Sequence, residues 1–73
     1  MEFEIKAKDG ALPCEVTIDE DNGRYMLRNA DTTGEFFETP TELRDWIQAN
    51  WNPNRFEDPN QFELLISELN SYT

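Results

Sequence analysis

The chain has 73 residues, of which sixteen are Asp or Glu, six are Lys or Arg and none is His, so the formal net charge is −10. This length leaves room for one hydrophobic core. We therefore expect a single domain over 1–73, with strand hairpins over 1–38 and two capped helices over 39–73. The negative charge repels nucleic acid and anionic lipid, which argues against direct nucleic-acid binding and against membrane binding.

The compartment is indicated by what the sequence lacks. Cys14 is the only cysteine, so no internal disulfide can form, which is typical of a reducing compartment. Residues 1–6 contain no apolar signal segment, and no apolar run approaches the length of a membrane span. These features predict a cytoplasmic protein.

The first half of the chain has the pattern of β-strands. Apolar residues alternate with charged or polar ones over 2–8 and again over 14–20, which predicts two half-buried strands. A hairpin turn then predicts a third strand over 24–29. The Asp-Thr-Thr-Gly sequence at 31–34 is a further turn signal, and 35–37 is expected to form a short fourth strand.

The hairpin between the second and third strands is predicted from the Asn-Gly sequence at 22–23. Both residue types tolerate positive φ, so a two-residue type I′ turn is expected. This turn places Asp21 opposite Arg24, where opposite charges meet, and Ile18 opposite Leu27 on one face of the sheet.

The second half of the chain predicts two helices, over 40–51 and over 59–70. Thr39 is expected to cap the first helix, with a proline at the first helical position and Glu42 reaching back to complete a capping box. The sequence Asp-Pro-Asn-Gln at 58–61 repeats this device for the second helix. Apolar residues then recur at helical spacing in both segments.

Together these elements predict an α+β fold. We expect a three- or four-stranded antiparallel meander followed by two helices packed on one of its faces, in the order βββ(β)αα. The expected core residues are Val16, Ile18, Leu27, Leu43, Ile47, Phe62, Leu65, Ile66 and Leu69.

No catalytic residue, metal ligand or cofactor is expected. The absence of His removes the commonest general base and transition-metal ligand, and it leaves Cys14 without a partner for nucleophilic catalysis. Cys14 is interpreted as a structural, partly buried thiol. The acidic run at 19–23 lacks the spacing of an EF-hand calcium loop, and the three glycines stand singly in turns. The chain is therefore expected not to be an enzyme.

The aromatic residues of the second half are expected to divide between core and surface. Trp46 lies at helical spacing with apolar residues and is expected in the core. Trp51, at the end of the first helix, is expected to be half exposed and is the aromatic candidate for a partner contact. Phe37 and Phe56 each precede a helix cap by two residues and are expected under the first helical turns.

Carboxylates gather at the hairpin tip, on the first helix and at the start of the second helix. A rigid scaffold that holds carboxylates can imitate DNA phosphates and base-edge acceptors, and so occupy the Arg and Lys residues of a DNA-binding protein. Acids at helix starts also interact favourably with the helix dipole, which is a sufficient alternative explanation for Glu42, Asp58 and Glu63. The candidate partner-binding residues are Asp19, Glu20, Asp21, Trp51, Glu57 and Asp58.

Three short pieces resemble parts of the small acidic anti-CRISPR proteins of phages, which inhibit type II Cas9 by mimicking DNA. They are the acidic turn at 21–23 followed by Tyr25, the Trp-Asn sequence at 51–52, and the Phe-Glu-Asp run at 56–58 that leads to Phe62. The order of these pieces is shared over roughly the last two-thirds of the chain.

The resemblance implies an inhibitor whose Asp21, Glu57 and Asp58 contact basic residues of the nuclease. The chain departs from the family pattern in two places. The family's proteins begin with a helix, whereas this chain opens in a predicted strand. Residues 59–61 (Pro-Asn-Gln) also replace acids that would face the nuclease.

Two functions remain open at this point. The first is a protein-binding inhibitor that mimics DNA and blocks a basic, nucleic-acid-binding surface such as that of a nuclease. The alternative is a bacterial regulatory or interaction domain whose acidity only gives solubility. In both cases the partner is a protein, and the chain is expected to be a monomer or a weak homodimer. Steep salt dependence of binding would favour the first function.

Overall fold

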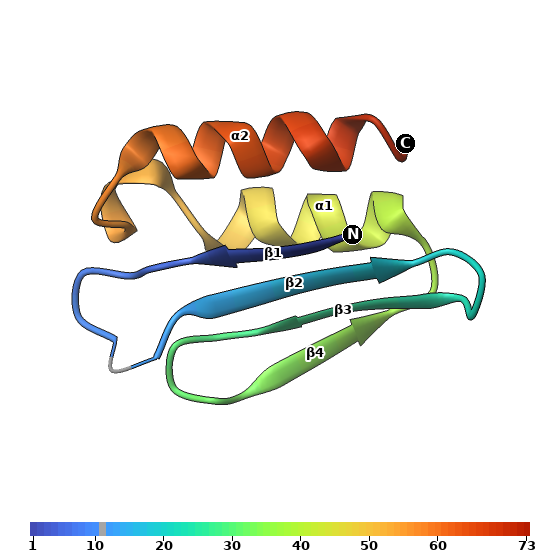
Figure 1. Cartoon of the computed structure of the whole chain (residues 1–73), viewed down its shortest axis with the longest axis horizontal. Helices are drawn as coiled ribbons and strands as arrows, with labels where there is room; N and C mark the ends of the chain where they lie inside the picture. The colour runs from blue at the N-terminus through green and yellow to red at the C-terminus, as the bar shows by residue number, and fades with distance from the viewer. Residues whose placement is uncertain (11) are drawn as a thin grey trace.

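A computed structural model describes residues 1–10 and 12–73, and it shows a four-stranded antiparallel sheet followed by two α-helices (Figure 1). The strands, in their spatial order, are β1 (Glu2–Ile5), β2 (Cys14–Asp19), β3 (Arg24–Arg28) and β4 (Gly34–Phe37). They are followed by α1 (Pro40–Asn50), a short 3₁₀ helix η1 (Pro53–Arg55) and α2 (Pro59–Asn70). The predicted α+β meander with two helices is confirmed, and it has four strands.

The core lies between the helices and one face of the sheet. α1 packs against β3 and β4, and α2 packs against β1, η1 and α1. Of the expected core residues, Ile66 is only partly buried and the others are buried. The buried cluster comprises Ile5, Ala7, Cys14, Val16, Ile18, Leu27, Leu43, Ile47, Trp51, Phe56, Phe62, Leu65 and Leu69.

The strand expected over 2–8 is longer than β1, because the chain changes its partner after the fifth residue. Ala7 forms an isolated antiparallel bridge with Phe56 instead of pairing with β2. Beside this bridge, the backbone N–H of Lys8 donates to the carbonyl of Arg55 at 2.8 Å. The segment that precedes α2 is thereby fixed to the end of β1.

The register predicted for the β2–β3 hairpin is wrong by two residues. Asp19, rather than Asp21, lies opposite Arg24, and Ile18 lies opposite Tyr25. Because side chains alternate between faces with a period of two, an even shift leaves every apolar residue on its predicted face. The core residues expected in these strands, Val16, Ile18 and Leu27, are therefore buried despite the wrong pairing. Cys14, expected to be partly buried, is fully buried beside them.

The cause of the shift is a four-residue turn in place of the expected two-residue turn. The Asn22 side-chain amide donates to Asp19 Oδ2 at 2.7 Å, and the N–H of Gly23 donates to the Glu20 carbonyl at 3.3 Å. Gly23 has a positive φ of 65°, whereas Asn22 does not. A four-residue loop that ends in a left-handed glycine is a common alternative to the type I′ turn.

Both helix starts have the predicted side-chain caps. Thr39 Oγ1 accepts a hydrogen bond from the N–H of Glu42 at 3.1 Å, and Glu42 Oε2 accepts one from the N–H of Glu38 at 3.2 Å. Asp58 Oδ1 accepts from the N–H of Asn60 at 3.0 Å. These bonds satisfy N–H groups that have no partner inside the helix, and each N-cap contributes about 1 kcal/mol.

A row of aromatic rings connects β4, the two helices and the segment between them. Its members are Phe37, Trp46, Trp51, Phe56 and Phe62, and successive ring centroids are 6.2, 6.2, 5.7 and 5.6 Å apart. Phe56 is fully buried, whereas Phe37 is only partly buried. The two helix starts therefore share their caps but not the burial of the preceding phenylalanine.

The expectation that Trp51 is half exposed is wrong. Its side chain is 3% exposed, and its Nε1–H donates to Asn29 Oδ1 at 3.0 Å. Leu43 and Ile47 lie four residues apart on the buried stripe of α1, and Trp51, the C-cap residue a further four residues on, extends this stripe just past the end of the helix. Trp46, outside this stripe, is the less buried of the two tryptophans.

Candidate protein-binding surface

The hairpin tip presents three of the predicted contact residues. Asp19 is half-buried, and the hydrogen bond from Asn22 lowers the pKa of its carboxyl group. Glu20 and Asp21 are exposed, and their side chains form no hydrogen bond or ion pair with any residue that the structure describes. The carboxylates of Glu20 and Asp21 are therefore available to a partner.

The carboxylates before α2 are already engaged within the domain. Glu57 lies 3.8 Å from Lys6 Nζ in an exposed ion pair, and Asp58 caps α2. An exposed pair of this kind contributes at most about 1 kcal/mol, so Glu57 can exchange Lys6 for a partner's cation at small cost. Asp58 has a structural role that a partner contact would have to share.

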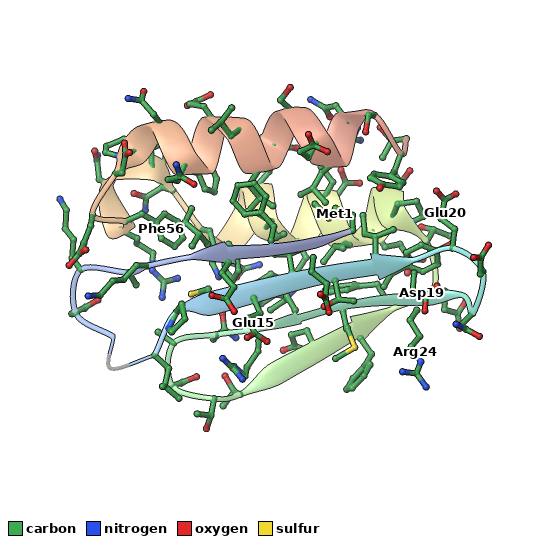
Figure 2. All side chains as sticks on the ribbon, in the orientation of Figure 1. Met1, Glu15, Asp19, Glu20, Arg24 and Phe56 are labelled. Carbon is green, nitrogen blue, oxygen red and sulfur yellow. The ribbon has the colours of Figure 1, made fainter. Side chains whose placement is uncertain are left out.

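The structure does not bring the six predicted contact residues together. Figure 2 shows Glu20 and Arg24 at the end of the molecule that holds the hairpin tip, and Phe56, which precedes the α2 start, toward the other end. The long axis of the molecule, along which these ends are separated, extends 32 Å. With Trp51 in the core as well, the predicted residues form two separate acidic groups and no single site.

The face of the sheet away from the helices is a surface that the sequence reasoning did not identify. Cross-strand partners share a face, so the register defines its members. We call it the open face, and it consists of Glu2, Glu4, Glu15, Thr17, Asp19, Arg24, Met26, Arg28, Gly34 and Phe36. Glu15, Asp19 and Arg24 are labelled in Figure 2.

The β1–β2 half of the open face is acidic. Glu4 lies directly opposite Glu15, and Glu2 is two residues away on the same face. Arg28 Nη2 lies 3.3 Å from Glu15 Oε1, whereas Glu2 and Glu4 have no ion-pair partner in the described part of the chain. A hollow of about 90 Å³ lies between the two strands, with these three glutamates and Thr17 in its lining.

The β3–β4 half of the open face is partly apolar. Met26 lies opposite Phe36, and Phe36 is 77% exposed. No other large apolar side chain in the described residues has so large an exposed fraction. The open face thus combines a carboxylate group on one side with an aromatic ring and a thioether on the other.

A second cavity lies at the far end of the sheet from the hairpin tip, and it has a volume of about 410 Å³. Its polar lining includes Arg55, whose guanidinium donates to the Asn50 carbonyl at 3.5 Å. The Asp31 carboxylate, also in the lining, accepts hydrogen bonds from the hydroxyl and N–H of Thr33, and these bonds lower its pKa.

Cys14 is buried, and burial raises the pKa of its thiol, which disfavours the reactive thiolate.

Among 1–10 and 12–73, no group of three or more His, Cys, Asp or Glu side chains is placed to hold a metal ion. In the same part of the chain, no helix has both the length and the apolar character needed to span a membrane.

Comparison with known proteins gives no family for this chain. No family model matches it, and neither does any curated protein or solved structure.

A sequence signal for part of the open face does exist. The alternation of residues 2–5 places Glu2 and Glu4 on the face opposite the apolar residues, so their exposure follows from the pattern. The position of Glu15 opposite Glu4 does not follow from the pattern, because no two-residue turn fixes the register of the β1–β2 hairpin. The sequence also leaves open which of Phe36 and Phe37 is exposed, since one of two adjacent strand residues must face outward.

Proposed function

We propose that this domain binds a protein with a basic surface and competes with nucleic acid for that surface. The observation that carries the proposal is the placement of the carboxylates. All sixteen are exposed except those of Glu15 and Asp19, which are half-buried. Within the described residues, only Glu15, Asp45 and Glu57 have a cation within ion-pair distance.

The charge density supports competition with DNA but indicates that charge alone is insufficient. B-DNA carries one negative charge per about 1.7 Å of its axis, so a 32 Å length carries about 19 charges. The protein presents a net charge of −10 over a similar length. It therefore has roughly half the linear charge density of DNA, and shape-specific or apolar contacts must supply the rest of its affinity.

The rigid placement of the carboxylates also supports the proposal. The tip residues lie on a hairpin held by the Asn22–Asp19 hydrogen bond, and Glu57 is held by the backbone pairing beside the Ala7–Phe56 bridge. Because the backbone that carries these carboxylates is already ordered, only the side chains have to be ordered when they meet Arg or Lys, which favours binding.

The resemblance to anti-CRISPR proteins suggests a type II Cas9 as one partner to test. The first element of this chain is a strand, β1, where the family begins with a helix, so the proposal rests on the charge arrangement and only secondarily on the resemblance. The function is inhibition by occupation of a DNA-binding surface, without catalysis and without a cofactor.

The test is displacement of labelled duplex DNA from a Cas9–guide complex, measured by fluorescence anisotropy at low and at high salt. The proposal predicts displacement that weakens steeply as salt increases. The variant Asp21→Lys/Glu57→Lys should lose several kcal/mol of binding, because like charges would face each other across the interface. A matched control, Glu63→Lys/Glu68→Lys on α2, makes the same change in net charge elsewhere.

Three outcomes would separate the alternatives. Equal losses in both double variants would mean that net charge rather than position determines binding. Absence of displacement, with basic proteins still bound in a salt-sensitive manner, would favour the general interaction domain over a DNA mimic. Absence of any binding to basic proteins at low salt would leave solubility as the role of the acidity.

A further inference from the structure

The open face contains a like-charge pair that the fold does not need. Glu4 and Glu15 are cross-strand partners, and like charges directly opposite one another destabilise a sheet. Arg28 approaches Glu15 from the other side, so it neutralises one member of the pair. Glu4 and its neighbour Glu2 have no ion-pair partner among the described residues. Departures from local rules of this kind occur where a surface serves a purpose other than stability.

The space between the two carboxylates can accept a cationic side chain. The hollow of about 90 Å³ is lined by residues of β1 and β2, and those of them that belong to the open face are the three glutamates and Thr17; Phe3 and Val16 complete the lining. An ammonium or guanidinium group inserted there would meet three carboxylates at once and would remove the repulsion between Glu4 and Glu15. Arginine can in addition form two parallel hydrogen bonds to one carboxylate.

The apolar half of the open face indicates a second property that a partner should have, which is an apolar side chain. Phe36 and Met26 lie side by side on β4 and β3, two strand spacings from the hollow, which is about 10 Å. Exposed aromatic rings and methionine are enriched in the centres of protein interfaces. A partner that places an apolar side chain here would bury Phe36, which is now 77% exposed.

The occupant of this surface is a basic partner rather than a second copy of the chain. Two copies that met face to face would each bring a net charge of −10 to the contact. The cations on the open face are Arg24 and Arg28, and Arg28 is already paired with Glu15. Self-association would therefore leave Glu2 and Glu4 without enough opposite charge, whereas a Lys- or Arg-rich partner provides it.

We propose that the open face docks a basic segment of the partner protein. One Lys or Arg of the segment lies in the hollow between Glu4 and Glu15, and an apolar side chain about 10 Å away packs on Met26 and Phe36. This inference rests on the proposed function and assigns it a surface. The hairpin-tip carboxylates then lie at one end of the docked segment, where they can contact further cations.

The experiment uses the whole chain and two synthetic probes. One is a lysine–serine peptide with two central leucines, and the other is the same peptide with serine in place of the leucines. Affinities are measured by isothermal titration calorimetry at low salt. Glu4→Gln/Glu15→Gln should weaken binding of both peptides by about tenfold, as expected for two partly exposed ion pairs. Phe36→Ser should weaken binding of the leucine peptide only.

The control is Glu63→Gln/Glu68→Gln, which removes the same charge from α2 and should reduce affinity by less than about twofold. Equal losses in the two charge variants, or no effect of Phe36→Ser, would overturn the docking surface and leave the proposed function standing. Failure of both peptides to bind the unaltered chain would overturn the proposed function itself. Self-association that Phe36→Ser abolishes, seen by sedimentation, would instead assign the face to a second copy.

Discussion

The two faces of the sheet differ in the kinds of residue that are paired on them, although the same strands form both. On the covered face, Val16 and Leu27 are cross-strand partners and are buried under the helices. On the open face, Glu4 lies opposite Glu15, and Phe36 is exposed beside Met26. The covered face has the buried apolar residues that a stable small domain requires. The open face has features that stability does not explain, and we therefore propose it as the surface that meets a partner.

The largest expected difference between the faces is in the loss of stability on truncation to alanine, and two neighbouring residues of β3 test it. Leu27 is buried and Met26 is a half-buried member of the open face. Leu27→Ala should lower the free energy of unfolding by about 2–5 kcal/mol, which is enough to unfold much of a domain of this size. Met26→Ala should cost less than about 1 kcal/mol. Urea denaturation of the two variants measures both, and equal losses would contradict the assignment of faces.

A smaller contrast is expected on α2, between adjacent residues that were both predicted to lie in the core. Leu65 is fully buried, whereas Ile66 is only partly buried. Leu65→Ala should therefore cost about 2–5 kcal/mol and Ile66→Ala roughly half as much or less. Thermal melts followed by circular dichroism would show the order. An Ile66→Ala melt as low as that of Leu65→Ala would mean that the helix is rotated from the described position.

A gain in stability is expected on the open face. Glu4→Gln removes one member of the Glu4–Glu15 pair, so it should raise the free energy of unfolding by a few tenths of a kcal/mol, up to about 1 kcal/mol. The increase should shrink at high salt, where repulsion between exposed charges is screened. A loss of stability in Glu4→Gln would show that the carboxylate has a structural role.

The smallest effect concerns pH and a residue outside both faces. Hydrogen bonds from Thr33 hold the pKa of Asp31 below its ordinary value, so the folded state binds this proton less readily than the unfolded state. The resulting stabilisation is present above about pH 4 and is lost as pH falls through the lowered pKa. Asp31→Asn should be slightly less stable than the parent at pH 7 and equally stable near pH 2. A difference that persists at pH 2 would exclude this explanation.

The elements of the fold could be predicted because their signals are local. Thr39 and Asp58 fix the starts of the helices through hydrogen bonds within four residues, and the alternation in β2 fixes its buried face. The pairing of strands could not be predicted with the same success. The hairpin register depends on whether Asn22 adopts positive φ or bonds to Asp19, and both are compatible with the sequence.

The binding surface was harder to predict than the fold, for a related reason. Net charge and exposed acids follow from composition, but their grouping depends on register and topology. Glu57 and Asp21 are both acidic and exposed, yet they belong to the segment before α2 and to the β2–β3 turn, which lie toward opposite ends of the molecule (Figure 1). The burial of Trp51 could have been predicted, since it continues the stripe of Leu43 and Ile47 along α1.

Whether the open face binds a basic partner is decided by mapping the surface that a bound peptide covers. The whole chain, labelled with ¹⁵N, is titrated with the lysine–serine peptide that carries two leucines, and amide chemical shifts are followed by NMR. We expect the largest shifts on β1 to β4 around Glu4, Glu15, Met26 and Phe36, with little change on the exposed side of α2. Largest shifts on α2, or shifts spread evenly over all exposed carboxylates, would contradict it.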